Sequence, residues 1–151
     1  MKKQQKGFSL IELLIVVAII LIIAAIAIPN LLRSKMAANE ASAVGSLRTI
    51  NTASVAFSVT YGNYPALLSN LATGTSVSST SADLIDSVLA SGTKSGYVFS
   101  YGAVAPFQQY ALTASPSTVN VTGQRYFYTD QSGVIRANTA GAATVASTPI
   151  S

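Results

Sequence analysis

The chain has 151 residues, of which half are apolar and only 9% are charged, and it contains no cysteine and no histidine. This length suffices for one domain and an N-terminal helix, and so little charge is unusual for a soluble enzyme. The missing residue types exclude disulfides, metal sites built on cysteine or histidine, and a histidine-based catalytic triad. We therefore expect no catalytic residues, no metal site and no cofactor.

The formal net charge of +4 is explained by its position along the chain. Three of the nine basic residues, Lys2, Lys3 and Lys6, precede a long apolar run, and the other six stand against five acidic residues. The rest of the chain is thus almost neutral, which removes the electrostatic basis for nucleic-acid binding. By the positive-inside rule, the three lysines place residues 1–7 in the cytoplasm and the C-terminal part outside.

The apolar run covers residues 8–28, where only Ser9 and Glu12 are polar. As a helix, these 21 residues span roughly 30 Å, the thickness of the hydrocarbon core of a bilayer. An ionisable group inside such a span costs about 2.5–3.5 kcal/mol near its centre, so Glu12 needs a partner or a purpose. A secretory signal peptide is disfavoured, because its apolar stretch is shorter than this run. An ordinary membrane anchor, with Glu12 near the interface, stays open.

The start of this run reads Lys6-Gly7-Phe8-Ser9-Leu10-Ile11-Glu12-Leu13. A short basic leader ends in glycine, and a phenylalanine follows that opens an apolar helix with glutamate at its fifth position. This pattern resembles the class III signal of type IV pilins and pseudopilins. Pro29 also fits, because it is the twenty-second residue counted from Phe8. The resemblance covers roughly residues 1–35 and specifies the family rather than the member.

The resemblance implies a role for several of these residues. Prepilin peptidase would cut between Gly7 and Phe8 and methylate the new amino terminus of Phe8. Glu12 would then attract the amino terminus of an adjacent subunit and so set the register of assembly. Pro29 would mark a kink, or a place where the helix loses order in a filament. The packing surface of the filament core would include Leu10, Ile11, Leu13, Leu14, Val17 and Leu21.

The helical pattern resumes after Pro29 and continues to about residue 60, which predicts one helix over residues 8–60. At 1.5 Å per residue this helix is on the order of 80 Å long, too long for a small domain to cover. Its second half has an apolar face formed by Ala43, Leu47, Ile50, Phe57 and Tyr61. The polar residues between them are expected on the wetter faces: Arg33, Lys35, Asn39, Glu40, Ser46, Arg48, Asn51 and Ser54.

The C-terminal part is predicted to be an antiparallel sheet laid on the second half of the helix. Strands are expected at residues 96–101, 108–114, 125–129 and 134–137, after a short helix over residues 81–89 with Ser81 as its N-cap. Asp130 and Gly133 supply the turn of a hairpin. Residues 138–151 have little to bury and are expected to form a loose edge. The predicted class is therefore α+β, with a long protruding N-terminal helix packed against a small antiparallel sheet.

Asp130 also raises a second hypothesis, because major pseudopilins of type II secretion usually hold calcium in their C-terminal loops. Calcium takes six to eight oxygen ligands, preferably with several carboxylates. Beyond Asp86 this chain offers Asp130 as the only acidic side chain. A plain hairpin turn is therefore the favoured interpretation, and a calcium site stays open.

These observations predict a prepilin, the precursor of a subunit that polymerises into a type IV pilus. Its segments would be a leader (residues 1–7), a transmembrane and filament-core helix (8–29), an amphipathic half-helix (30–61) and a globular head (62–151). The chain would cross the inner membrane once before it joins an extracellular filament. Its partners would be copies of itself, prepilin peptidase, an assembly platform in the inner membrane and, through it, a cytoplasmic ATPase. A type II secretion pseudopilin is the alternative, and a monomeric membrane-anchored binding protein is the third reading.

Overall fold

The computed structural model describes residues 7–74 and 76–150, which form two compact units divided between Ser34 and Lys35. A single helix, α1, runs from Leu10 to Tyr61 over 52 residues. The predicted helix over residues 8–60 is confirmed, with ends shifted by one or two residues. Lys2, Lys3 and Lys6 lie outside the described residues.

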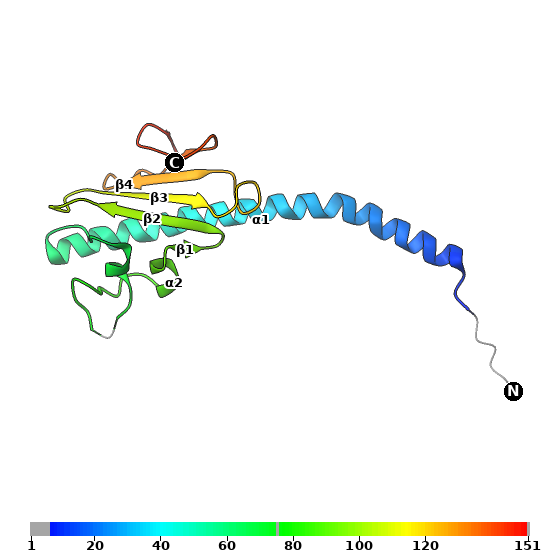
Figure 1. Cartoon of the computed structure of the whole chain (residues 1–151), viewed down its shortest axis with the longest axis horizontal. Coiled ribbons are helices and arrows are strands. Elements are labelled where there is room, and N and C mark those ends of the chain that lie inside the picture. Colours follow the sequence, from blue (N-terminus) through cyan, green and yellow to red (C-terminus); the bar gives the residue numbers. More distant parts are fainter. Residues whose placement is uncertain (1–6, 75, 151) are drawn as a thin grey trace. The chain divides into compact units, whose positions relative to one another are not determined.

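The second unit contains a six-stranded antiparallel sheet in which each strand pairs with the next along the chain. Figure 1 shows β2, β3 and β4 side by side along the C-terminal part of α1. The helix and sheet together confirm the α+β class. The strands are β1 (Thr93–Lys94), β2 (Tyr97–Ala103), β3 (Tyr110–Pro116), β4 (Tyr126–Asp130), β5 (Arg136–Asn138) and β6 (Thr148–Pro149).

The core lies between the predicted apolar face of α1 and one face of the sheet. Leu47 and Ile50 of α1 are fully buried, as are Tyr97 of β2 and Phe127 of β4. The sheet residues alternate, since Phe127 is buried and its neighbours on β4 are half-exposed. Four predicted strands are confirmed to within two residues at each end. β1 and β6 are two-residue edge strands that the sequence pattern does not signal.

The expectation that the polar residues of α1 face water is wrong for four of them. The structure buries Glu40, Ser46, Asn51 and Ser54. The reason is that the sheet and its loops supply polar partners for two of these side chains. Asn51 donates to the Thr129 hydroxyl at 2.9 Å and accepts from the Tyr110 hydroxyl at 3.0 Å. Buried polar groups that are paired in this way carry little desolvation cost.

The predicted helix over residues 81–89 is also corrected. The helix in this region, α2 (Ser87–Ala90), has four residues, and its N-cap is Asp86, whose carboxylate accepts from the Leu89 amide. Residues 82–85 instead donate their backbone N–H groups to carbonyls of Asn70 and Leu71 in the 3-10 helix η1 (Leu68–Leu71) and of Ala72 next to it. Since those amides bind another segment, they cannot build helical turns of their own.

The C-terminal tail is more ordered than expected. β6 pairs with β5, and the Ile150 amide donates to the Ile135 carbonyl at 2.8 Å. Arg136 donates from Nη1 to the Ser147 carbonyl, and Ala143 is buried. The loose edge predicted for this tail is therefore wrong for its described residues, because backbone pairing fixes the segment although it buries few side chains.

Candidate functional site

Gly7 and Phe8, the two residues around the expected cleavage point, precede the helix. Neither is assigned to a helix or strand, and α1 begins two residues after Phe8. The Phe8 side chain is 81% exposed. Among the described residues other than its chain neighbours, none has an atom within 4 Å of the position where a Cβ would stand on Gly7. Within the described part of the chain, nothing therefore crowds the peptide bond between them. Since Phe8 lies outside the helix, it and Glu12 do not share a helical face in this chain.

The carboxylate of Glu12 caps the start of α1. Its Oε2 accepts a hydrogen bond of 2.9 Å from the Ser9 amide, and the Ser9 carbonyl accepts from the Leu13 amide at 3.2 Å. Ser9 thus stands at the N-cap position, and Glu12 stands three residues later, as in a capping box. The sequence carries this signal as serine followed by glutamate at the third position, and our sequence analysis missed it.

The cap occupies only part of the hydrogen-bonding capacity of Glu12. An ionised carboxylate has two oxygens with about four acceptor sites. Among the described residues, only Oε2 of Glu12 receives a bond. A negative charge in the first turn also interacts favourably with the positive end of the helix dipole. Glu12 therefore can stabilise its own helix and still accept a bond from an external donor.

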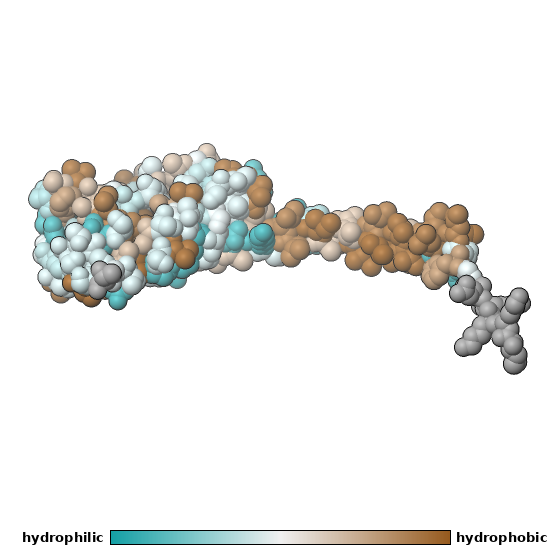
Figure 2. Space-filling view, turned by 60° about the horizontal axis from the view of Figure 1, so that its bottom comes forward, coloured by the Kyte–Doolittle hydropathy of each residue, from teal (hydrophilic) through white to brown (hydrophobic). Residues whose placement is uncertain are grey.

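The apolar side chains that follow Glu12 are exposed within the chain. The 18-residue window that is long and apolar enough to cross a membrane has no buried residue. Figure 2 shows this stretch as a nearly continuous hydrophobic surface. Exposed apolar surface of this extent marks an interface with lipid or protein. The six predicted packing residues are 46% to 78% exposed: Leu10, Ile11, Leu13, Leu14, Val17 and Leu21.

Pro29 lies inside α1, which the structure keeps helical on both sides of it. Proline has no N–H group, so the helix lacks one backbone hydrogen bond at this turn. Such a gap is tolerated in a membrane helix when neighbouring groups satisfy the freed carbonyl. Pro29 is thus the weakest turn of the helix in hydrogen-bonding terms, although the helix continues through it.

The N-terminal segment matches a family model described as the prokaryotic N-terminal methylation motif, over residues 2–28. By this segment, the chain is similar to type IV pilins and pseudopilins. The relatives found include type IV pilins, which are similar to the chain in its N-terminal part. The type IV wide pilus major component PilA4 of Thermus thermophilus is 60% identical over 38 residues, 25% of this chain and 29% of the relative. The type IV major pilin protein PilA of Myxococcus xanthus is 46% identical over 54 residues, 36% of this chain and 24% of the relative.

A protein of a type II secretion system is also similar to this chain. The type II secretion system core protein G of Aeromonas hydrophila is 31% identical over 64 residues, 42% of this chain and 45% of the relative. The chain spans between about a quarter and a half of the length of these three relatives. No solved structure matches the chain. The likeness to pilins and pseudopilins is therefore carried by the N-terminal part.

Asp130, the residue considered for calcium, makes hydrogen bonds within the turn between β4 and β5. Its Oδ1 accepts from the Ser132 amide and hydroxyl, and Gly133 takes a positive φ of 74° as the turn closes. The predicted hairpin is confirmed by the antiparallel pairing of β4 with β5. Within residues 7–74 and 76–150, no three acidic side chains come together as metal ligands do.

Proposed function

We propose that this chain is a prepilin, a structural subunit that is processed and then polymerises into a type IV pilus. The observation that carries the proposal is the exposed apolar stretch of α1 headed by Glu12, in a segment that matches the methylation motif. A single chain cannot bury this surface, whereas lipid can cover it before assembly and sister helices can cover it afterwards. The protein has no catalytic function of its own in this proposal.

Processing is proposed at the bond between Gly7 and Phe8. Prepilin peptidase would cut this bond on the cytoplasmic side and methylate the amine of Phe8. The open surroundings of Gly7 and the exposure of Phe8 support access by an enzyme. The lysines of the leader would hold the site at the inner surface of the membrane. The head would then lie outside the inner membrane, and the chain would reach the extracellular filament through an assembly platform and its cytoplasmic ATPase.

Glu12 is proposed to pair with the amino terminus of a neighbouring subunit after cleavage. The acceptor capacity that the Ser9 amide leaves unused on Glu12 supports this role. In an apolar filament core the attraction between carboxylate and amine is stronger than in water, and an unpaired charge is costly. A subunit that enters at the wrong height would leave both charges unpaired. The pair therefore selects the axial offset at which a subunit is accepted.

The proposal is tested by examining sheared surface fibres. We expect electron microscopy to show filaments, and mass spectrometry of the fibre protein to find a chain that starts at Phe8 and carries one methyl group on its amine. A chain found only in the membrane, with residues 1–7 still attached, contradicts the proposal and favours a monomeric anchor.

The alternative is a pseudopilin of type II secretion, which would form a short periplasmic filament. The similarity to the core protein G of Aeromonas hydrophila favours it. The scarcity of carboxylates near Asp130 favours the pilin, since calcium prefers several of them. Removing calcium distinguishes the two functions. A chelator should lower the thermal midpoint of a pseudopilin that holds calcium and should leave the thermal midpoint of the proposed pilin unchanged.

A further inference from the structure

A hollow of about 490 Å³ lies on the sheet face opposite to α1, beside the hairpin between β2 and β3. Its floor is a row of residues paired across three strands, Gly102 with Ala111 and Ala111 with Asp130. The residues next to this row in sequence, such as Leu112 and Thr129, point into the core. Gly102 has no side chain and Ala111 has only a methyl group, so the row leaves space above two of the three strands.

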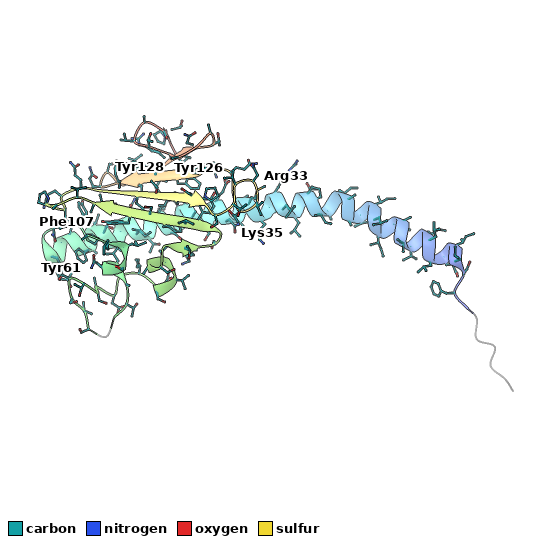
Figure 3. The ribbon with its side chains drawn as sticks, viewed as in Figure 1. Arg33, Lys35, Tyr61, Phe107, Tyr126 and Tyr128 are labelled. Atoms are coloured by element: carbon teal, nitrogen blue, oxygen red, sulfur yellow. The ribbon has the colours of Figure 1, made fainter. Side chains whose placement is uncertain are left out.

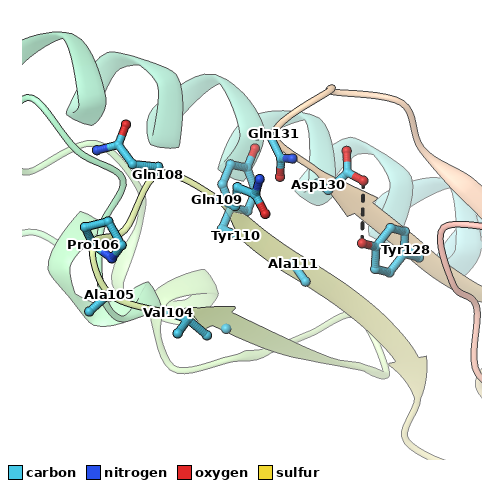
Figure 4. Close-up of a pocket in the computed structure, with 11 residues that line it drawn as sticks. Val104, Ala105, Pro106, Gln108, Gln109, Tyr110, Ala111, Tyr128, Asp130 and Gln131 are labelled. Carbon is cyan, nitrogen blue, oxygen red and sulfur yellow. Dashed lines mark hydrogen bonds between the residues drawn. The ribbon is translucent and has the colours of Figure 1, made fainter.

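The hollow has two walls. Val104 and Pro106 of the β2–β3 hairpin form one side, and Tyr128 of β4 and Gln131, which follows β4, form the other (Figure 4). The hairpin is tied down, because the Phe107 carbonyl accepts from the Tyr64 amide at 2.9 Å. Figure 3 places Phe107 near Tyr61, which ends α1. This wall is therefore held in place by the chain that follows the helix.

Polar groups converge on the hollow from both walls. Gln109 and Gln131 present amides, Tyr128 presents a hydroxyl, and Asp130 presents a carboxylate. Oδ2 of Asp130 has only a long contact of 3.5 Å, to the Tyr128 hydroxyl. Within the described part of the chain, Asp130 makes no ion pair. Its carboxylate thus keeps acceptor capacity toward the hollow.

The chemistry of the lining selects among ligands. No basic side chain lines the hollow, and Asp130 is the one charged residue of its lining, so the lining disfavours an anion. Vicinal hydroxyls suit the lining better, because they donate to a carboxylate and both donate to and accept from amides. The apolar side of a sugar ring can lie against Tyr128 or Pro106. The size falls within the range of small-ligand sites.

We propose that the hollow above Gly102 and Ala111 binds a neutral saccharide, with Asp130, Gln109 and Gln131 as its hydrogen-bonding groups. This site belongs to the head alone and does not depend on whether the chain forms a filament. Bonds from sugar hydroxyls to Asp130 would be charge-assisted and therefore the strongest of the set.

The test is saturation-transfer NMR on the full chain in dodecylphosphocholine micelles, a detergent without a sugar headgroup. The probes are maltose, lactose, cellobiose and chitobiose, and at least one is expected to receive saturation. Gly102→Val should abolish the signal, because the new side chain fills the hollow. It should fold, since no atom lies within 4 Å of the position of a Cβ on Gly102 and valine favours strands.

Two further variants test whether the charge of the Asp130 carboxylate contributes to sugar binding. Asp130→Asn keeps an oxygen for Ser132 and removes the charge, so it should weaken binding about tenfold. Asp86→Asn removes a charge that pairs with Lys94 elsewhere and should change nothing. The proposal is overturned if none of the four sugars binds, or if Gly102→Val binds as the unaltered chain does. It is equally overturned if calcium chloride or benzylamine binds through Asp130 and no sugar does.

Discussion

Glu40 on α1 and Arg125 before β4 form an ion pair of 2.7 Å between Oε2 and Nε, although 85 residues separate them in sequence. The other carboxylate oxygen of Glu40 accepts from the backbone amides of Gln124 and Arg125, at 2.8 and 3.2 Å. Burial by itself raises the pKa of Glu40, but these bonds outweigh it, and the net pKa lies below the usual value. Glu40 is thus the point where the helix holds the loop that leads into β4.

This pair predicts a specific loss of stability in acid. The folded state holds the Glu40 carboxylate ionised, so the unfolded state takes up the proton first as the pH falls. Stability is therefore fully present above the ordinary pKa of 4.5 and declines as the pH drops through and below it. Glu40→Gln should cost about 1–2 kcal/mol at pH 7 and flatten this decline. Chemical denaturation followed by tyrosine fluorescence between pH 3 and about pH 7 measures both. Parallel curves for the two proteins would count against the role of Glu40.

Asn51 and Ser54 are neighbours on the buried side of α1 with opposite predicted effects. Asn51→Ala would leave the hydroxyls of Thr129 and Tyr110 without their partner and should cost about 2–3 kcal/mol. Burial raises the pKa of Tyr110 to about 12, so its hydroxyl stays a donor at neutral pH. Ser54 is fully buried, and within the described residues its Oγ has no partner in good hydrogen-bond geometry. The Tyr101 hydroxyl lies close enough to interact with it, but that hydroxyl is also buried without a well-placed partner. Ser54→Ala should therefore be neutral or stabilise by up to about 1 kcal/mol.

Urea denaturation of both variants checks this pair. If Ser54→Ala lost as much stability as Asn51→Ala, the Asn51 amide and the Ser54 hydroxyl would not differ in hydrogen bonding as the structure indicates.

Gly123 and Gly45 give a second matched pair. A Cβ on Gly123 would collide with the hydroxyl and ring of Tyr97, which is buried and donates to the Arg125 carbonyl at 2.9 Å. Gly123→Ala should therefore cost about 1–3 kcal/mol. Gly45 lies inside α1 with open space around it, so Gly45→Ala should stabilise by about 0.5–1 kcal/mol.

Thermal midpoints of the two alanine variants should move in opposite directions. Tyr97→Phe removes the hydroxyl that collides with the new methyl, so it should recover part of the loss in the Gly123→Ala background. Absence of any coupling between these two positions would contradict the contact.

Sequence patterns predicted the helices and strands that are determined by the spacing of neighbouring residues. The apolar spacing of Leu47, Ile50 and Phe57 located the helix face, and alternation around Phe127 located β4. The burial of Glu40 and Asn51 was missed because their partners lie 59 to 85 residues away and leave no trace in local spacing. α2 was misplaced because the amides of residues 82–85 donate to another segment, Asn70 to Ala72, which the helical pattern of residues 81–89 does not reveal. The cap of Ser9 by Glu12 is local and was readable.

The cap and the proposed pairing of Glu12 can be separated by one substitution. Glu12→Gln keeps an oxygen that can accept from the Ser9 amide, as glutamine does in capping boxes, and removes the charge. Glu12→Ala removes both. If pairing with an amino terminus matters, both variants fail in assembly, whereas a purely capping role leaves Glu12→Gln intact.

The most direct measurement is the amount of the Glu12→Gln chain in the sheared-fibre fraction and in the membrane fraction, relative to the unaltered chain. We expect the membrane amount to be unchanged and the fibre amount to fall about tenfold or more, since a lost charge pair of about 1.4 kcal/mol or more is tenfold in affinity. A normal yield of fibres from Glu12→Gln would contradict the proposal that this carboxylate sets the register of a filament.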